Sequence, residues 1–292
     1  MNNQSILVVA FDGLDKELID RYNCEHLKQQ EYRSIDNKTN MSSIMTSELF
    51  ASFITGENWK EHGVKGVTYP NSKPKKKLVN KLDNTKLAGL LPGYTRFIDA
   101  LKELIGYRVE KYTKEDYEEL TLFEVIEDSR AMFVPSYEPS LFWLADSDLV
   151  NPLDKGFTLD EVARHYEREF VYRKKQFFEE IESENRDLLM VHFHKPDIYQ
   201  HLYEEDGKEN EGKLEGMYAE IDSLAGQIKA NSDYDYIIFM SDHGKPTQKE
   251  HNENAFYSSN KPLFNSKPLI TDFYDAILDI SAQENETEGI DL

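Results

Sequence analysis

The stretch YDYIIFMSDHG, residues 234–244, decides the fold, because an apolar run of strand length ends there in Ser-Asp-His-Gly. Short continuous apolar runs are typical of strands buried in a parallel sheet. In open α/β sheets, ligands bind beyond the carboxyl ends of the strands. The stretch therefore predicts a core strand at 234–240 and places Asp242 and His243 at the edge where ligands bind.

The rest of the chain alternates apolar runs with amphipathic stretches. Further strands are expected at residues 6–11 (ILVVAF) and 187–194 (DLLMVHFH). The periodicity predicts helices at 158–184 and 211–230, and a last helix in ITDFYDAILDI, residues 270–280. This alternation predicts an α/β fold in which helices cover a mostly parallel sheet.

A single domain is expected over residues 1–281, with an inserted segment at 68–118 and a disordered acidic tail at 282–292. The insertion carries a basic cluster in an otherwise acidic chain. One interpretation is a solvated loop with one short helix. The other is a cap whose lysines bind an anionic substrate, and the candidates for that role are Lys75, Lys76 and Lys77.

The composition limits the class of partner. The 292-residue chain has a formal net charge of −21, which argues against nucleic acid or an anionic membrane as an electrostatic partner. Its one cysteine, Cys24, leaves no internal disulfide and fits a reducing compartment. No apolar run approaches the ~20 residues of a membrane-spanning helix. We therefore expect a cytoplasmic protein that acts on a small molecule; the sequence does not indicate its oligomeric state.

Possible metal ligands follow three of the expected strands. Asp12 follows the first, Asp197 and His201 follow the strand at 187–194, Asp242 and His243 follow the strand at 234–240, and His251 lies in a later loop. Carboxylate oxygen and imidazole nitrogen suit zinc or a similar first-row divalent ion. Each residue alone has a structural explanation, such as a turn or a shared helical face. Four other histidines, at 26, 165, 192 and 194, are expected in the surface or the core.

Thr46 stands where the amphipathic helix SELFASFITG should begin. A hydroxyl at that position is often a helix N-cap. The same position also suits a nucleophile, because the backbone N–H groups and the positive end of the helix dipole would face a bound phosphate.

These residues together resemble the alkaline phosphatase superfamily, and most of all its type I phosphodiesterase and nucleotide pyrophosphatase branch. The motifs that carry the resemblance run in order along residues 6–260: FDG at 11–13, Thr46 with TG at 55–56, HG at 62–63, PDIYQH at 196–201, SDHG at 241–244, and His251. The resemblance implies a three-layer α/β/α fold and a hydrolase of phosphoric esters, either diesters or pyrophosphates.

The resemblance also implies roles for individual residues. Asp197, His201 and His251 would hold one divalent ion, and Asp12, Asp242, His243 and the Thr46 hydroxyl would hold a second, with Zn²⁺ expected first and Mn²⁺ as the alternative. Thr46 would attack phosphorus and form a phospho-threonine intermediate that water releases. The backbone N–H of Ser47 would help to bind the equatorial oxygens.

Some residues depart from the family pattern, and other functions stay open. Glu48 and Leu49 stand where relatives often have Pro and Asn, and a Glu48 carboxylate near the phosphate would disfavour a dianionic monoester. His62 is expected to support a helix–loop junction rather than to bind metal. The alternatives are a phosphotransferase or mutase of the same superfamily, and a non-catalytic, metal-stabilised binding module.

Overall fold

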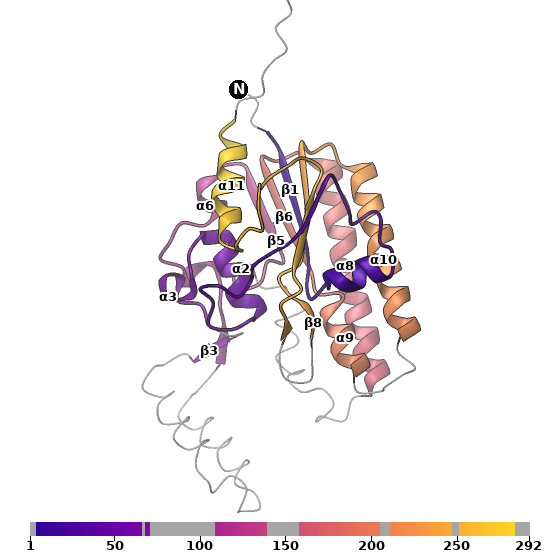
Figure 1. Ribbon diagram of the computed structural model, residues 1–292. Helices are drawn as coiled ribbons and strands as arrows, with labels where there is room; N and C mark the ends of the chain where they lie inside the picture. The colour runs from indigo at the N-terminus through magenta and orange to yellow at the C-terminus, as the bar shows by residue number, and fades with distance from the viewer. Residues whose placement is uncertain are drawn as a thin grey trace, which may run out of the picture.

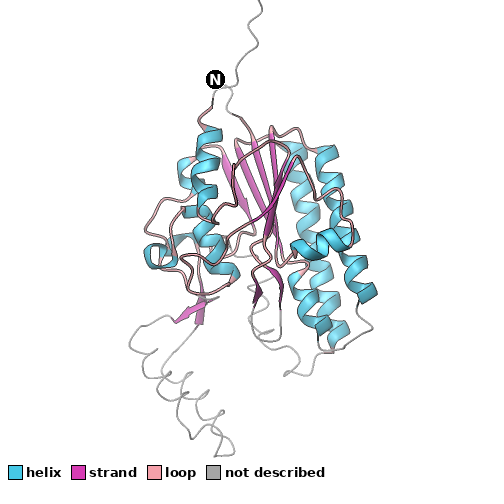
Figure 2. Cartoon of the chain, viewed as in Figure 1, coloured by secondary structure: helices cyan, strands magenta, loops and turns pink. Residues whose placement is uncertain are grey.

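The computed structural model describes residues 4–65, 68–70, 109–138, 158–204, 211–246 and 251–283. Its centre is a six-stranded sheet in the order β2-β10-β7-β1-β6-β5, with helices on both faces (Figures 1 and 2). The expected three-layer α/β/α architecture is confirmed.

The bounds of the elements follow the chain. Its first half contains β1 (Ile6–Phe11), α1 (Lys16–Arg21), β2 (Glu31–Ser34), α2 (Thr46–Thr55), α3 (Trp59–His62), β3 (Thr68–Pro70), β4 (Val109–Lys111), the 3-10 helix η1 (Lys114–Asp116), α6 (Leu122–Val125) and β5 (Ser129–Met132). Its second half contains α8 (Leu159–Ser183), β6 (Leu188–Phe193), α9 (Asp197–Glu204), α10 (Glu211–Asn231), β7 (Tyr236–Met240), β8 (Gly244–Pro246), β9 (His251–Asn252), β10 (Phe256–Ser259) and α11 (Asp272–Ser281).

The sheet is parallel in its centre. β1 pairs in parallel with β6 on one side and with β7 on the other, and β5 extends the sheet in parallel beyond β6. β10 runs antiparallel to both of its neighbours, β7 and β2. The carboxyl ends of β1, β6 and β7 therefore meet at one edge, as the sequence predicts.

The alternation of side chains along each strand divides the core into two layers. In β1, Leu7, Val9 and Phe11 pack with α8 and α10, whereas Ile6, Val8 and Ala10 pack with α2, α6 and α11. All six residues of β1 and all six of β6 are buried. Strands covered on both faces have to be apolar throughout, which is why their sequences read as continuous apolar runs.

Capping residues fix where several helices begin. The Asp15 side chain accepts hydrogen bonds from the backbone N–H groups of Glu17 and Leu18 at the start of α1. Thr158 and Glu161 form a capping box at the start of α8. These caps orient the helices relative to the ends of the strands that carry the polar residues described below.

The ends of the inserted segment come together in a short ribbon, since β3 pairs antiparallel with β4. Residues 71–108, with Lys75, Lys76 and Lys77, lie outside the described residues, so the choice between loop and cap stays open, as does the boundary of the domain. Most of the tail at 282–292 also lies outside them. Within the described part of the chain, no helix is long and apolar enough to cross a membrane.

Candidate active site at the carboxyl edge of the sheet

The residues expected to form the site come from separate segments and meet at one edge of the sheet. Asp12 directly follows β1, Asp197 begins α9 just after β6, and Asp242 and His243 follow β7. His251 begins β9, and Thr46 is the first residue of α2. The topology thus brings together segments that are up to about 240 residues apart in the sequence.

One group of side chains surrounds the hydroxyl of Thr46. Its Oγ1 lies 3.3 Å from Asp12 Oδ1 and 3.3 Å from His243 Nε2. His243 Nε2 lies 3.1 Å from Asp12 Oδ1 and 3.5 Å from Asp242 Oδ2. In Asp12, Asp242 and His243, one possible ligand atom per residue lies within 4.8 Å of the others, and all three residues are buried.

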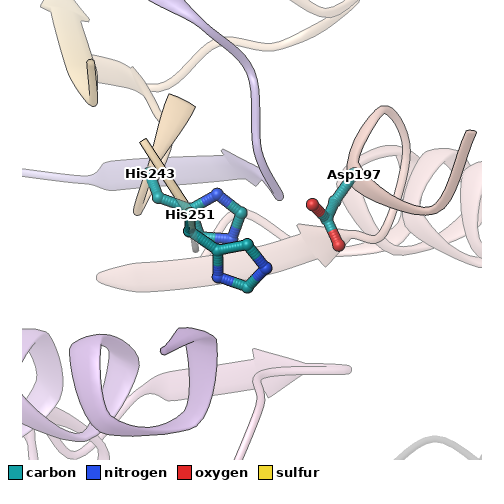
Figure 3. Close-up of side chains that lie close together, drawn as sticks. All are labelled: Asp197, His243 and His251. Atoms are coloured by element: carbon teal, nitrogen blue, oxygen red, sulfur yellow. The ribbon is translucent and has the colours of Figure 1, made fainter. Parts of the chain in front are cut away.

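A second group lies beside the first. His201 Nε2 is 3.5 Å from Asp197 Oδ1 and 3.4 Å from His251 Nε2. Possible ligand atoms of Asp197, His243 and His251 also lie within 4.8 Å of one another, and Figure 3 shows these three side chains together. The rings of His243 and His251 stack with their centroids 3.9 Å apart. The structure therefore places His243 next to both groups, although the sequence assigned it only to the first.

Backbone carbonyls determine which imidazole nitrogen faces the site. His243 Nδ1 lies 2.8 Å from the Gly244 carbonyl oxygen, and His251 Nδ1 lies 2.9 Å from the Ile44 carbonyl oxygen. A carbonyl oxygen only accepts, so each Nδ1 carries the proton and donates it. Each Nε2 of a neutral ring then presents its lone pair to the site, which is how a histidine ligates a metal ion.

The electrostatics of the site favour a bound cation. Burial raises the pKa of Asp242 to about 7, and burial followed by the charge of Asp12 raises the pKa of Asp197 well above its usual value. Burial opposes charge on His243 as well, but Asp242 and then Asp12 outweigh it and raise its pKa to about 10. Burial would raise the pKa of Asp12 as well, but the nearby His192 and His243 rings outweigh it, and the pKa of this carboxyl is lowered.

Two carboxylate oxygens show that the donor set fits such a cation. Asp197 Oδ1 and Asp242 Oδ2 are buried and have no hydrogen-bond donor among the described residues. Leaving a buried charged oxygen without a partner is costly. A divalent cation would satisfy both oxygens and, together with the imidazole nitrogens, completes a donor set typical of first-row metals.

Thr46 is not the N-cap of its helix. The N-cap is Met45, whose side chain makes no capping hydrogen bond, and Thr46 is the first residue with helical geometry. The threonine hydroxyl instead faces Asp12 and His243, so the capping interpretation of Thr46 is wrong. Next to it, the carbonyl oxygen of the buried Ser47 accepts a hydrogen bond of 3.0 Å from Ser136 Oγ, which ties the start of α2 to the turn after β5.

The structure shows what the Glu48 side chain contacts. Its side chain is fully buried, and its carboxylate accepts hydrogen bonds from the backbone N–H groups and the hydroxyls of Ser42 and Ser43. The carboxylate therefore organises the loop that precedes Thr46. His62 takes the position expected for it, since it bonds Ser52 and the backbone of Val64.

Three residues around the site were not expected from the sequence. His192 Nε2 lies 3.5 Å from Asp12 Oδ2, Asn37 Nδ2 donates to the Asp242 carbonyl oxygen at 2.7 Å, and Asp15 Oδ2 accepts from Lys245 N at 2.9 Å. Only His192 had a signal in the sequence, because a histidine inside an otherwise apolar strand is unusual. The contacts of Asn37 and Asp15 depend on the tertiary structure.

Gly13 allows Asp197 to lie close to the backbone that follows Asp12. It has a φ of 68°, and a Cβ at this position would lie 2.9 Å from both Cβ and Oδ1 of Asp197. The backbone N–H of Asp197 also donates to the Asp12 carbonyl oxygen at 2.9 Å. Any larger residue at position 13 would therefore displace Asp197.

Comparison with solved structures gives low sequence identities. A structure of murine ectonucleotide pyrophosphatase/phosphodiesterase 5 is 14% identical, covers 82% of this chain and 57% of its own, and has a TM-score of 0.48. An inactive variant of the murine protein, in complex with AMP, has the same identity and coverage with a TM-score of 0.46. The PH0037 protein from Pyrococcus horikoshii is 11% identical, covers 96% of this chain and 98% of its own, and has a TM-score of 0.48.

The chain thus spans just over half the length of the murine structures. A search of curated proteins gives no match.

The fold and the site together define an α/β protein with an acidic and imidazole-rich centre at the ends of its parallel strands, beside a threonine at a helix start. The chain belongs to the type I phosphodiesterase/nucleotide pyrophosphatase family, whose model matches residues 6–270. The resemblance seen in the sequence motifs is confirmed.

Proposed function

We propose that the protein is a metal-dependent phosphoric ester hydrolase that cleaves diesters or pyrophosphates through a phospho-threonine at Thr46. Membership of the family supports the class of reaction. The observation that carries the proposal is the position of Thr46 Oγ1, 3.3 Å from both Asp12 Oδ1 and His243 Nε2. A threonine that served only the helix would cap it instead.

Two divalent ions fit the donor set, Zn²⁺ first and Mn²⁺ as the alternative. One would be held by Asp12, Asp242, His243 and the Thr46 hydroxyl, and the other by Asp197, His201 and His251. When bound, such ions lower the pKa of a hydroxyl and stabilise the negative charge of attacking and leaving oxygens.

The residues of the chain supply the nucleophile and its surroundings. A bond forms between Thr46 Oγ1 and phosphorus while the bond from phosphorus to the leaving oxygen breaks, and water later cleaves the phospho-threonine. The start of α2 presents backbone N–H groups, including that of Ser47, to the equatorial oxygens. Glu48 holds the loop at 42–43 in place through its hydrogen bonds with Ser42 and Ser43.

The substrate, the location and the acceptor of the phosphoryl group are also part of the prediction. The substrate class, a small phosphoester, follows from the family, and the lysines at 75–77 would serve only a substrate with additional negative charge. The cytoplasmic location rests on the sequence composition. Transfer to an alcohol instead of water would make the protein a phosphotransferase, and product analysis with an added alcohol acceptor distinguishes the two reactions.

The test of the proposed function compares Thr46→Ala with Thr46→Ser in an assay with an aryl phosphodiester and added Zn²⁺ or Mn²⁺. Removing the hydroxyl should lower kcat by about three orders of magnitude or more, because the covalent route is lost. The serine variant should keep measurable activity. Mass spectrometry after an acid quench should find phosphate on Thr46 in the wild-type protein.

Thr55→Ala is the matched control, since Thr55 lies at the other end of the same helix and its hydroxyl bonds the Ala51 carbonyl oxygen at 2.8 Å. It should keep near wild-type kcat. A Thr46→Ala variant with most of the wild-type rate would rule out the covalent mechanism.

A further inference from the structure

A fully buried histidine lies directly behind the candidate metal ligand Asp12. His192 sits in β6, in the register position next to Ala10 of β1, and its side chain is 0% exposed. Its ring contacts the Phe50 ring of α2 edge to face, with centroids 4.9 Å apart. The neighbouring residues Val191 and Phe193 belong to the apolar core on the other face of the sheet.

An equally buried arginine reaches His192 from α8. Arg173 is 1% exposed, and its Nη1 donates to the His192 carbonyl oxygen at 2.7 Å and lies 3.3 Å from His192 Nδ1. Its Nη2 forms an ion pair with Glu169, which is 2% exposed. α8 packs on the opposite face of the sheet, and the guanidinium lies over the ring of Phe133, the residue that follows β5.

This contact sets the tautomer of His192. A guanidinium has only donors, so Nδ1 of His192 has to be the acceptor. The ring is then neutral and its proton is on Nε2. Among the described residues Nε2 makes no full hydrogen bond, and the contact that it does make is to Asp12 Oδ2 at 3.5 Å.

The two oxygens of Asp12 therefore have different surroundings. Oδ1 faces the site, 3.1 Å from His243 Nε2 and 3.3 Å from Thr46 Oγ1, whereas Oδ2 faces the N–H group of His192. We propose that His192, held by the Arg173–Glu169 pair, is a positioning residue that fixes the Asp12 carboxylate with Oδ1 directed at the cation. This inference rests on the proposed function, because it requires that Asp12 binds a metal ion.

In this role, His192 limits the rotation of the Asp12 carboxylate before a cation binds. Residues that orient the ligands of a metal ion typically change its affinity by about 10- to 100-fold when they are removed. The effect should be confined to one of the two ions, since His192 contacts Asp12 and has no contact with Asp197 or His251 among the contacts of the described residues.

Two substitutions of His192 separate positioning from packing. His192→Asn places an amide near the position of Nδ1, where its oxygen accepts from Arg173 but nothing donates to Asp12. His192→Gln places an amide near the position of Nε2, where its N–H group donates to Asp12. Titration with Zn²⁺ alone, against a chromophoric chelator, should show one of two ions bound about 10- to 100-fold more weakly in H192N and close to wild type in H192Q.

His26→Asn is the matched control, because the exposed His26 side chain lies beside Gly226 of α10 and has no contact with Asp12, His192 or Arg173 among the contacts of the described residues. It should bind both ions as the wild type does. The Tm of each metal-free variant shows whether packing alone has changed. The tautomer itself is read by NMR on wild-type protein with ¹⁵N-labelled histidine, where His192 should carry its proton on Nε2 with and without Zn²⁺.

The outcomes distinguish this inference from the proposed function. Equal Zn²⁺ affinities in H192N, H192Q and the wild type, or a proton on Nδ1 of His192, would overturn the positioning role and leave the two-metal site intact. A wild-type protein that binds neither Zn²⁺ nor Mn²⁺ would overturn both.

Discussion

The imidazole of His62 has both of its nitrogens committed to neutral partners. The Val64 backbone N–H donates to Nδ1 at 3.1 Å, so the proton is on Nε2, which lies 2.9 Å from Ser52 Oγ. A second proton on Nδ1 would point at the N–H group of Val64. Burial lowers the pKa of His62 to about 4 from its ordinary value of 6.5, and the nearby charge of Glu61 offsets only part of this effect.

His62 should therefore make the fold sensitive to acid. Its folded pKa is below the unfolded value, so its contribution to stability is complete above pH 6.5 and is lost as the pH falls toward 4. Urea unfolding between pH 7 and pH 4 should show the free energy of unfolding of the wild type declining by up to about 3 kcal/mol more than that of His62→Gln. Parallel pH profiles for the two proteins would show that His62 is not the titrating group.

The site residues could be predicted from the sequence where a side chain that can bind metal follows an apolar run of strand length. Asp12, Asp242 and His243 follow apolar runs directly, so their place at a sheet edge follows from the fold. His192 could not be assigned in this way, because its role depends on Arg173, which comes from a helix on the other face of the sheet. The contacts of Glu48 with Ser42 and Ser43 likewise depend on a loop conformation that no periodicity encodes.

At the scale of elements, the hairpin of β8 and β9 carries His251 and directly follows His243. Asp15 holds it in place: its Oδ2 accepts from Lys245 N at 2.9 Å and from Asn252 Nδ2 at 3.1 Å, while its Oδ1 caps α1. A Cβ on Gly244 would lie 2.6 Å from the same carboxylate oxygen. The buried Asp15 carboxylate thus connects the start of α1 to the β8–β9 hairpin that carries His251.

Asp15→Ala should cost about 2–4 kcal/mol of stability, from the lost helix cap and the lost charge-assisted hydrogen bonds. Hydrogen exchange of the Lys245 amide should become faster, since its acceptor is gone. Thr158→Ala removes a cap from α8 whose side-chain hydrogen bonds, among the described residues, are with Glu161 and not with Lys245 or Asn252, so it should cost about 1 kcal/mol and leave Lys245 exchange unchanged. Equal exchange rates in wild type and Asp15→Ala would mean that other contacts hold the hairpin.

The elements that the sequence predicted are those with a strong pattern. β1, β6 and β7 are apolar runs, and α8 and α10 are long and periodic, so their positions agree with expectation to within a few residues. β2 (EYRS) and β10 (FYSS) were not assigned. Each has only four residues with little apolar character, and each becomes a strand because β10 pairs antiparallel with β7 and β2 pairs with β10.

At the scale of the whole molecule, the site connects the first strand to the last third of the chain through three buried carboxylates, Asp12, Asp197 and Asp242. Under the proposed function, metal removal should therefore lower the stability of the entire fold. With Zn²⁺ in about 1,000-fold excess over the Kd of a site, each bound ion contributes about 4 kcal/mol, so chelation should lower the Tm by about 10 °C or more.

Asp242→Asn provides the control for this measurement at pH 8. Without metal, the variant should have a higher Tm than the wild type, because one repelling carboxylate is gone. With Zn²⁺ it should have a lower Tm, because a ligand is gone. If chelators left the wild-type Tm unchanged, bound metal would not stabilise the fold.

The central position of β1 also has a consequence for synthesis on the ribosome. Ile6 pairs with Leu188, and the other neighbour of β1, β7, is later still in the chain. At translation speeds of about 5–20 residues per second, β1 emerges roughly 10–40 seconds before its first sheet partner exists. During that interval six consecutive apolar residues have no strand to pair with, so this segment of the nascent chain is exposed to aggregation.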